Sequence, residues 1–223
     1  MFDLSSILMK DIVRMQKYVD RTVERIRKEL CVNLEYISIE YDPEIPTFME
    51  TQHGKIKISD NENASSDIIE YGILHEIGHR TVRSLNPNFN PSVTRKLLGY
   101  DADKCNSLKL YFDVYVKNFY ESYVPVGMIE GSAEFFAIDV FSRICDVSGS
   151  CKFFMFERAI LHKSFSLPLI NEYALGYNFF HEMNNNSGLQ NTMKFIRDVE
   201  NYDIPKRKDM KAPLNYIIRN SLI

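Results

Sequence analysis

The chain has 223 residues, of which 45% are hydrophobic and 26% charged, the proportions of a globular protein. This length favours a single domain that can bury a substantial core. The formal net charge of −3 excludes a generally basic surface for nucleic acid. No apolar run approaches the ~20 residues of a membrane-spanning helix, and the amino end does not resemble a secretory signal. We therefore expect a cytoplasmic protein that binds neither nucleic acid nor membranes.

The four cysteines are Cys31, Cys105, Cys145 and Cys151, and no two of them form a C-x-x-C pair. This pattern favours reduced thiols, as in most cytoplasmic proteins. An alternative is a disulfide between Cys145 and Cys151, which lie on either side of a Ser-Gly-Ser turn. The sequence leaves both possibilities open.

The amino-terminal residues 1–30 are predicted to form a helix. Apolar residues recur there at helical spacing, and lysines and arginines occupy the other face. The pattern changes over 31–41, where apolar and polar residues alternate as in a half-buried strand. Asp42-Pro43 marks the end of this predicted strand.

A hairpin is predicted within residues 48–59, around a turn at His53-Gly54. Lysines alternate with isoleucines over 55–59, which favours either a solvated face or an edge position in the sheet. All predicted strands therefore fall within residues 31–60.

The rest of the chain is predicted to be helical. Ser65-Ser66-Asp67 is a helix start signal, and the helix it opens is predicted over 65–85. Further helices are predicted at 92–98, 101–122, 127–146, 151–164, 168–185, 188–201 and 213–221. Because one helix and a few strands precede many helices, the predicted fold class is α+β, mostly α.

The helix over 65–85 contains the motif H-E-x-x-H. His75 and His79 are four residues apart and share one helix face, so both imidazoles can reach one Zn²⁺. Glu76 lies ~100° round the helix, where it can accept a proton from water beside the metal without being a ligand. The surrounding residues are apolar, and buried histidines without partners would be costly there. The alternative is a pair of surface or core histidines with ordinary partners.

A zinc site with catalytic function needs a third protein ligand. Glu130 and Glu134 are again four residues apart, within the helix predicted over 127–146. One of them can bind the metal, and the other can hydrogen-bond the free ring nitrogen of a ligand histidine. Glu130 is the favoured ligand, while Glu134, Glu121, His162 and His181 are the alternatives.

The segments His75-Glu76-Ile77-Gly78-His79 and Glu130-Gly131-Ser132-Ala133-Glu134 together resemble the gluzincins, metallopeptidases of the thermolysin and aminopeptidase-N type. Small archaeal minigluzincins are also similar. The resemblance covers roughly residues 32–145 and implies a zincin-like fold in which a small sheet precedes the motif helix. The helical character predicted for the region 151–223 rests on the sequence pattern alone. The resemblance also implies that Glu130 binds zinc and that Glu134 hydrogen-bonds a ligand histidine, His75 above all. The interval between the two motifs is longer than in those families.

Two further segments have counterparts in such enzymes. Tyr173 lies in a Tyr-x-x-Gly segment like the one whose phenol supports the oxyanion in aminopeptidase-like gluzincins, and a fixed donor of this kind stabilises growing charge on a carbonyl oxygen. Tyr177, His181 or an ordinary core role for Tyr173 are the alternatives. The strand at 55–59 is similar in position to the zincin edge strand that pairs with extended substrate; a hairpin that only covers the core is the alternative.

The sequence thus predicts a zinc metallopeptidase acting on peptides or proteins, with Glu76 as general base and Tyr173 as oxyanion donor. One alternative is a zincin-fold regulatory protein that cleaves a single partner or none. Another is a structural zinc domain, closed by a fourth ligand such as Cys105.

Overall fold

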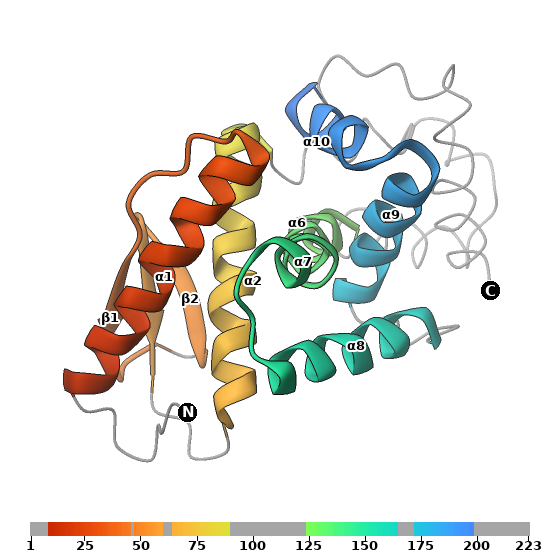
Figure 1. Ribbon diagram of the computed structural model, residues 1–223. Coiled ribbons are helices and arrows are strands. Elements are labelled where there is room, and N and C mark those ends of the chain that lie inside the picture. Colours follow the sequence, from red (N-terminus) through yellow and green to blue (C-terminus); the bar gives the residue numbers. More distant parts are fainter. Residues whose placement is uncertain (1–8, 46, 60–63, 90–123, 165–171, 199–223) are drawn as a thin grey trace, which may run out of the picture. The chain divides into compact units, whose positions relative to one another are not determined.

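The computed structural model describes residues 9–45, 47–59, 64–89, 124–164 and 172–198 (Figure 1). Its internal contacts divide the chain into two compact units. The sheet unit comprises Met1–Ser84 and Phe136–Ala159, and the helical unit comprises Leu85–Phe135 and Ile160–Ile223.

Helix α1 (Met9–Leu30) opens the described part of the sheet unit and packs against strand β1. Its inward face is a row of buried apolar side chains three or four residues apart: Met15, Val19, Val23, Ile26 and Leu30. The described residues of α1 therefore confirm the helix predicted over 1–30.

The sheet has three strands, β1 (Ser38–Tyr41), β2 (Met49–Gln52) and β3 (Lys55–Ile58), in the order β1-β3-β2. Strand β3 is parallel to β1 and antiparallel to β2. His53 and Gly54 join β2 to β3 with positive φ angles of 47° and 81°. Two successive positive φ angles are what a two-residue type I′ hairpin turn needs, so the predicted hairpin and its turn are confirmed.

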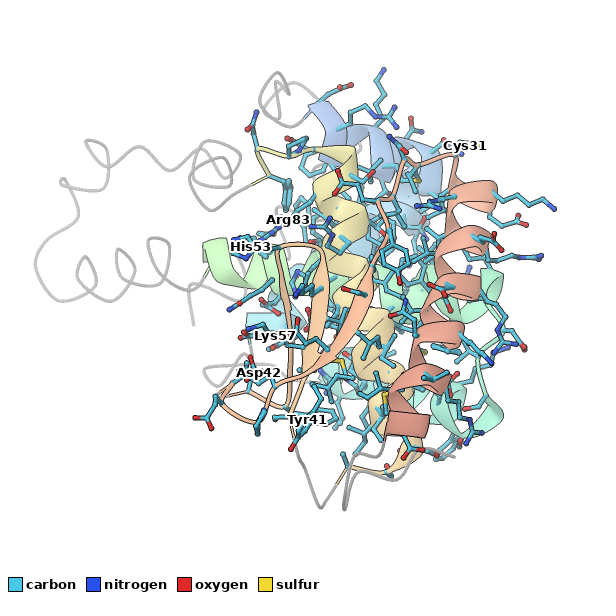
Figure 2. The ribbon with its side chains drawn as sticks, turned by 90° about the vertical axis from the view of Figure 1, so that its left-hand side faces the viewer. Cys31, Tyr41, Asp42, His53, Lys57 and Arg83 are labelled. Carbon is cyan, nitrogen blue, oxygen red and sulfur yellow. The ribbon has the colours of Figure 1, made fainter. Side chains whose placement is uncertain are left out.

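Of the two positions predicted for the lysine-bearing strand, the solvated face is confirmed and the edge position is wrong, because β3 is the central strand of the described sheet. The strand at 55–59 therefore cannot pair with extended substrate as the zincin edge strand does. Its lysines are explained by the solvated face of the sheet. Lys55 forms an ion pair with Glu40 at 2.7 Å, and Lys57 forms one with Asp42 at 2.8 Å. Figure 2 shows Lys57 and Asp42 on the side of the sheet away from α1. The isoleucines between the lysines point inward and are fully buried.

The strand predicted over 31–41 is correct only at its end, where β1 lies. Residues 31–35 alternate between exposed and buried side chains as expected, but Glu35 and Tyr36 are both exposed before buried Ile37, and no residue of 31–37 has a ladder partner. Side chains of α1 bind this stretch instead: Arg27 donates to the carbonyl oxygen of Leu34, and Gln16 to that of Ile37. Alternating burial needs only an extended chain lying on a core, so the pattern overestimates the length of the strand.

Helix α2 (Ser66–Leu85) confirms the helix predicted over 65–85. The helix predicted over 127–146 is present as α6 (Val124–Phe135), a π-helical turn η2 (Phe136–Phe141) and α7 (Ser142–Ile144). The π-helical turn was not predicted, and all of its residues are buried. Helix α8 (Gly149–Ser164) follows.

The helical unit is built around α6, α9 (Glu172–Ser187) and α10 (Leu189–Asp198). Helices α6 and α9 cross in backbone contact. A Cβ atom added at Gly131 would lie 2.3 Å from the Cα atom of Gly176, and one added at Gly176 would lie 1.9 Å from the carbonyl oxygen of Gly127. Buried phenylalanines, Phe179, Phe180 and Phe195 among them, fill the space beside this crossing.

The described chain is mostly helical with one small sheet, which confirms the α+β, mostly α class. The helices predicted at 92–98, 101–122 and 213–221 lie outside the described residues. None of the described helices has both the length and the apolar character to cross a membrane. Cys145 and Cys151 are free thiols and both are buried, so the alternative of a disulfide between them is not realised.

Candidate metal centre

The side chains of His75, Glu76 and His79 converge on one side of α2. One ligand atom from each can be chosen so that all three lie within 4.8 Å of one another. The two imidazole rings have centroids 4.8 Å apart and stand nearly perpendicular, at 87°. His75 and Glu76 are only 7% and 8% exposed, and His79 is half-buried. Such a group can hold a divalent metal ion, because both histidine and carboxylate donors suit one.

Strand β2 holds the carboxylate of Glu76. The hydroxyl of Thr51 donates to Glu76 Oε2 at 2.7 Å. Thr51 pairs with Ile56 in the sheet, and Ile56 is fully buried, so both side chains lie on the inward face. Thr51 therefore orients the Glu76 carboxylate through Oε2.

A second contact explains why β2 can approach α2 so closely. Met49 lies two residues before Thr51 on the same strand face, and its Sδ atom would be 3.2 Å from a Cβ atom at Gly72. Alternate strand residues are about 6.7 Å apart, and residues four apart on a helix are about 6 Å apart. The pairs Met49–Gly72 and Thr51–Glu76 can therefore form together. Because Gly72 has no side chain, β2 can lie close to α2 at this point. The next inward-facing residue of β2, Thr51, then reaches Glu76.

Sequence reasoning did not identify Thr51. Its position could have pointed to it, because Thr51 lies two residues before the His53-Gly54 turn, on the strand face shared with buried Met49. A hydroxyl on an inward strand face needs a polar partner. The sequence alone does not say that this partner is Glu76.

An aromatic and cationic stack adjoins His75. The Tyr71 ring, one helical turn before His75, has its centroid 6.1 Å from that of the imidazole. Arg158 from α8 lies over the Tyr71 ring at 4.8 Å, and Phe154 meets the same ring edge-on at 5.2 Å. A cation in this position is stabilised by the ring face. The stack brings a cationic side chain from α8 onto the Tyr71 ring, and sequence reasoning did not identify Arg158.

A separate polar cluster anchors α8 to α2. The buried carboxylate of Glu70 accepts hydrogen bonds from the Tyr18 hydroxyl at 3.0 Å and from the backbone N–H of Ser148 at 3.1 Å. The Ser148 hydroxyl also donates to Glu70, and it accepts the backbone N–H of Cys151 in the first turn of α8. Burial and the neighbouring Glu70 carboxylate raise the pKa of Tyr18 well above its usual value. Glu70 is thus a structural carboxylate, although it lies on the same helix as Glu76.

The two predicted glutamates lie on α6 in the helical unit. Glu130 is half-buried and Glu134 fully buried. A hydrogen bond of 2.6 Å joins Glu134 Oε1 to Nε2 of His162, which is itself 4% exposed. Asn178 donates to the backbone carbonyl of His162 at 2.7 Å. His162 is thus a histidine partner of Glu134, whereas the predicted partner was a metal-binding histidine, His75 above all. The pairing of Glu134 with His75 and the ligand role of Glu130 stay predictions.

The candidates on α9 differ in burial. Tyr173 is half-buried and lies one turn before Gly176, where α9 crosses α6. Tyr177 is fully buried, with its ring against those of His162 and His181, at centroid distances of 5.1 Å and 5.5 Å. Burial makes Tyr177 a core residue, whereas Tyr173 keeps partial exposure. The other candidate residues, Glu121 and Cys105, lie outside the described part of the chain.

Comparison with models of protein families, with curated proteins and with solved structures finds no match to this chain. The chemistry of the site must therefore be argued from its own residues.

Proposed function

We propose that this chain is a zinc-dependent peptidase of the gluzincin type, with a zincin-like fold, acting on peptides or proteins. The observation that supports it most directly is the convergence of His75, Glu76 and His79 within 4.8 Å, on a helix beside the edge of a small sheet. A buried carboxylate that sits beside two imidazoles and is held by a hydroxyl is what water activation requires.

His75 and His79 would hold the metal together with Glu130, leaving a coordination position for water. Zinc, when bound, supplies a Lewis acid that lowers the pKa of water and polarises a carbonyl group. The donor set fits this ion, since two imidazoles and one carboxylate form a common set in catalytic zinc sites.

Glu76 acts as the general base. Its carboxylate takes a proton from the attacking water and passes it to the departing amine nitrogen. The hydrogen bond from Thr51 keeps Oε2 turned toward the strand, which leaves Oε1 to take the proton. We assign the oxyanion donor to Tyr173, whose phenol can stabilise negative charge on the carbonyl oxygen. Glu134 would orient a ligand histidine such as His75 through its free ring nitrogen.

Strand β2 is the part of the sheet that we expect to bind an extended peptide. It is an edge strand of the described sheet, and the side chain of Thr51 reaches Glu76 from it. An extended peptide can add to such an edge through main-chain hydrogen bonds, which lays its backbone beside the general base.

The experiment compares two variants of the full chain, Glu76→Gln and His75→Ala. Zinc per chain is measured by plasma mass spectrometry, and cleavage is measured on a peptide library and on an unfolded protein. We expect Glu76→Gln to abolish cleavage and keep one zinc, and His75→Ala to lose both. His53→Asn is the matched control, because His53 is exposed on the hairpin turn and asparagine tolerates its positive φ.

Two results would count against the proposal. Cleavage that survives Glu76→Gln contradicts the assigned base, and zinc retained in His75→Ala contradicts the ligand set. Zinc binding by the unmodified chain without cleavage of any substrate would favour the regulatory alternative. Parallel alanine variants of Glu130, Glu134 and His162 identify the third ligand, since only the true ligand should abolish zinc binding.

A further inference from the structure

The sheet unit contains a pocket that is separate from the H-E-x-x-H motif. It has a volume of about 370 Å³ and lies between α1 and the segment 143–146 that ends α7. Small-ligand pockets begin at about this size. Four residues of α1 and the four residues 143–146 form its walls.

Three arginines line this pocket: Arg21, Arg25 and Arg143. Arg25 has one carboxylate neighbour, Glu29, at 3.4 Å. Within the described part of the chain, Arg21 and Arg143 have no carboxylate within ion-pair distance. Arg21 and Arg25 also lie four residues apart on one helix face, where like charges repel. An anion between these side chains would remove that repulsion.

Two of these guanidinium groups are already positioned. Arg25 donates from Nε to the backbone carbonyl of Ile144 at 3.0 Å, and Arg21 donates from Nε to that of Lys17 at 3.3 Å. Both bonds use Nε, and no bond from the terminal Nη nitrogens of either arginine occurs among the residues described. The paired Nη donors, which suit the oxygens of phosphate and carboxylate groups, are therefore available to a ligand.

Thr22 provides an independent indication. It lines the pocket and is only 5% exposed, yet its hydroxyl makes no hydrogen bond to any residue in the described ranges. Buried hydroxyls normally have a partner. No side-chain atom of the described chain is both fully buried and unpartnered, so solvent must reach the Thr22 hydroxyl, and this pocket offers the route.

We propose that this pocket binds a small phosphate monoester, with the phosphate held by Arg21, Arg25, Arg143 and the Thr22 hydroxyl. The three arginines outnumber the carboxylates beside them, Asp146 in the wall and Glu29 next to Arg25, so the pocket has a local excess of positive charge that attracts a phosphate anion. Several guanidinium donors and a hydroxyl can meet the terminal oxygens of one phosphate. The pocket has room for an organic group beside it. The proposal does not depend on the metal centre or on peptidase activity.

The test is titration calorimetry of the full chain with three probes: inorganic phosphate, phenyl phosphate and succinate. We expect one site per chain for phenyl phosphate, weaker binding of inorganic phosphate and no binding of succinate. The double variant Arg21→Ala/Arg143→Ala should weaken phenyl phosphate binding roughly a hundredfold, at about tenfold for each lost charge-assisted contact. Thr22→Val should weaken binding about fivefold, and Asp146→Asn should strengthen it.

Arg197→Ala is the matched control, because Arg197 is an exposed arginine on α10 and does not line the pocket. It should bind phenyl phosphate as the unmodified chain does. Arg21 and Arg143 are also exposed, so their replacement should preserve the fold, which thermal unfolding checks. The proposal is overturned if no phosphate probe binds, if succinate binds as tightly, or if the double variant binds as tightly as Arg197→Ala. Tighter binding of inorganic phosphate than of phenyl phosphate would overturn the assignment to a monoester.

Discussion

At the scale of single residues, the contact between Thr51 and Glu76 says most about mechanism. A carboxylate that must accept and release a proton works best when its orientation is fixed in advance. The Thr51 hydroxyl provides this at 2.7 Å, from a strand whose position is set by sheet pairing. Thr51 acts through Glu76, so it is a positioning residue in the proposed reaction.

We predict that Thr51→Val lowers the turnover number about tenfold or more and changes KM little. The loss follows from removing a hydrogen bond to a charged group, and valine keeps the shape and strand propensity of threonine. Thr51→Ser is the control and should recover most of the activity. Steady-state kinetics on a peptide substrate gives the result, and zinc content should not change. Equal activity of the valine and serine variants would contradict the positioning role.

The local part of the site could be predicted from the sequence, because helical spacing places His75, Glu76 and His79 on adjoining faces without reference to the rest of the fold. Thr51 and Arg158 could not, since their positions depend on how a strand and a second helix pack against α2. The same limit applies to Glu130. Its spacing from Glu134 is readable in the sequence, but the distance from either to the imidazole pair is a property of tertiary structure.

At the scale of elements, the crossing of α6 and α9 gives the glycines of two motif-like segments a packing role. Gly131 belongs to the Glu-Gly-Ser-Ala-Glu segment and Gly176 to the Tyr-x-x-Gly segment, and the two meet in backbone contact. Their neighbours Glu130 and Tyr173 are thereby held at the same helix crossing. The sequence suggested each segment separately, and their contact is a result of the structure.

We predict that Gly131→Ala and Gly176→Ala each destabilise the chain by at least about 3 kcal/mol, at the upper end for overpacked cores. The added methyl group would meet backbone atoms, which cannot move aside as a flexible side chain can. Gly149→Ala is the control. It has open space around its Cβ position, and alanine favours a helix by up to about 1 kcal/mol. Urea unfolding monitored by circular dichroism measures all three. A loss of stability at Gly149 equal to that at Gly131 would contradict the explanation.

The strands show where periodicity misleads. Alternation predicted the hairpin well because the His53-Gly54 turn also fixed its register. It overextended the first strand, because residues 31–35 bury alternate side chains without a ladder partner. The alternating lysines of β3 favoured either a solvated face or an edge position, and they do not distinguish the two, because lysines occur on the solvated face of a central strand as well as at an edge.

At the scale of the whole molecule, buried side chains with raised pKa values predict that the folded chain becomes less stable at alkaline pH. Burial raises the pKa of Cys145 from 9.0 to about 12, and burial together with Glu70 raises the pKa of Cys151 and of Tyr18. Above pH 9 the unfolded chain releases these protons and the folded chain retains them. The folded state then binds more protons than the unfolded state, so the free energy of unfolding falls as pH rises.

We predict that the urea concentration at the midpoint of unfolding decreases steadily between pH 9 and about 11. Between pH 7 and 8.5 the midpoint should change much less. Cys145→Ala should reduce the slope, because its unfolded state no longer has that proton to release. Cys31→Ala is the control, since Cys31 is exposed and should leave the slope unchanged. A midpoint that is flat across this range would contradict the assigned pKa directions.

The hairpin formed by β2 and β3, which holds the Glu76 carboxylate, also restricts insertions and deletions in strand β2. Its turn has only two residues, and Thr51 faces α2 only while it is paired with Ile56. Because successive side chains point to opposite faces, losing or gaining one residue in β2 would present Glu50 or Gln52 to α2 in its place. A glutamate there would set a second carboxylate against the first. Substitutions on the outer face should be tolerated, whereas insertions and deletions in this strand keep Thr51 on the inward face only in steps of two.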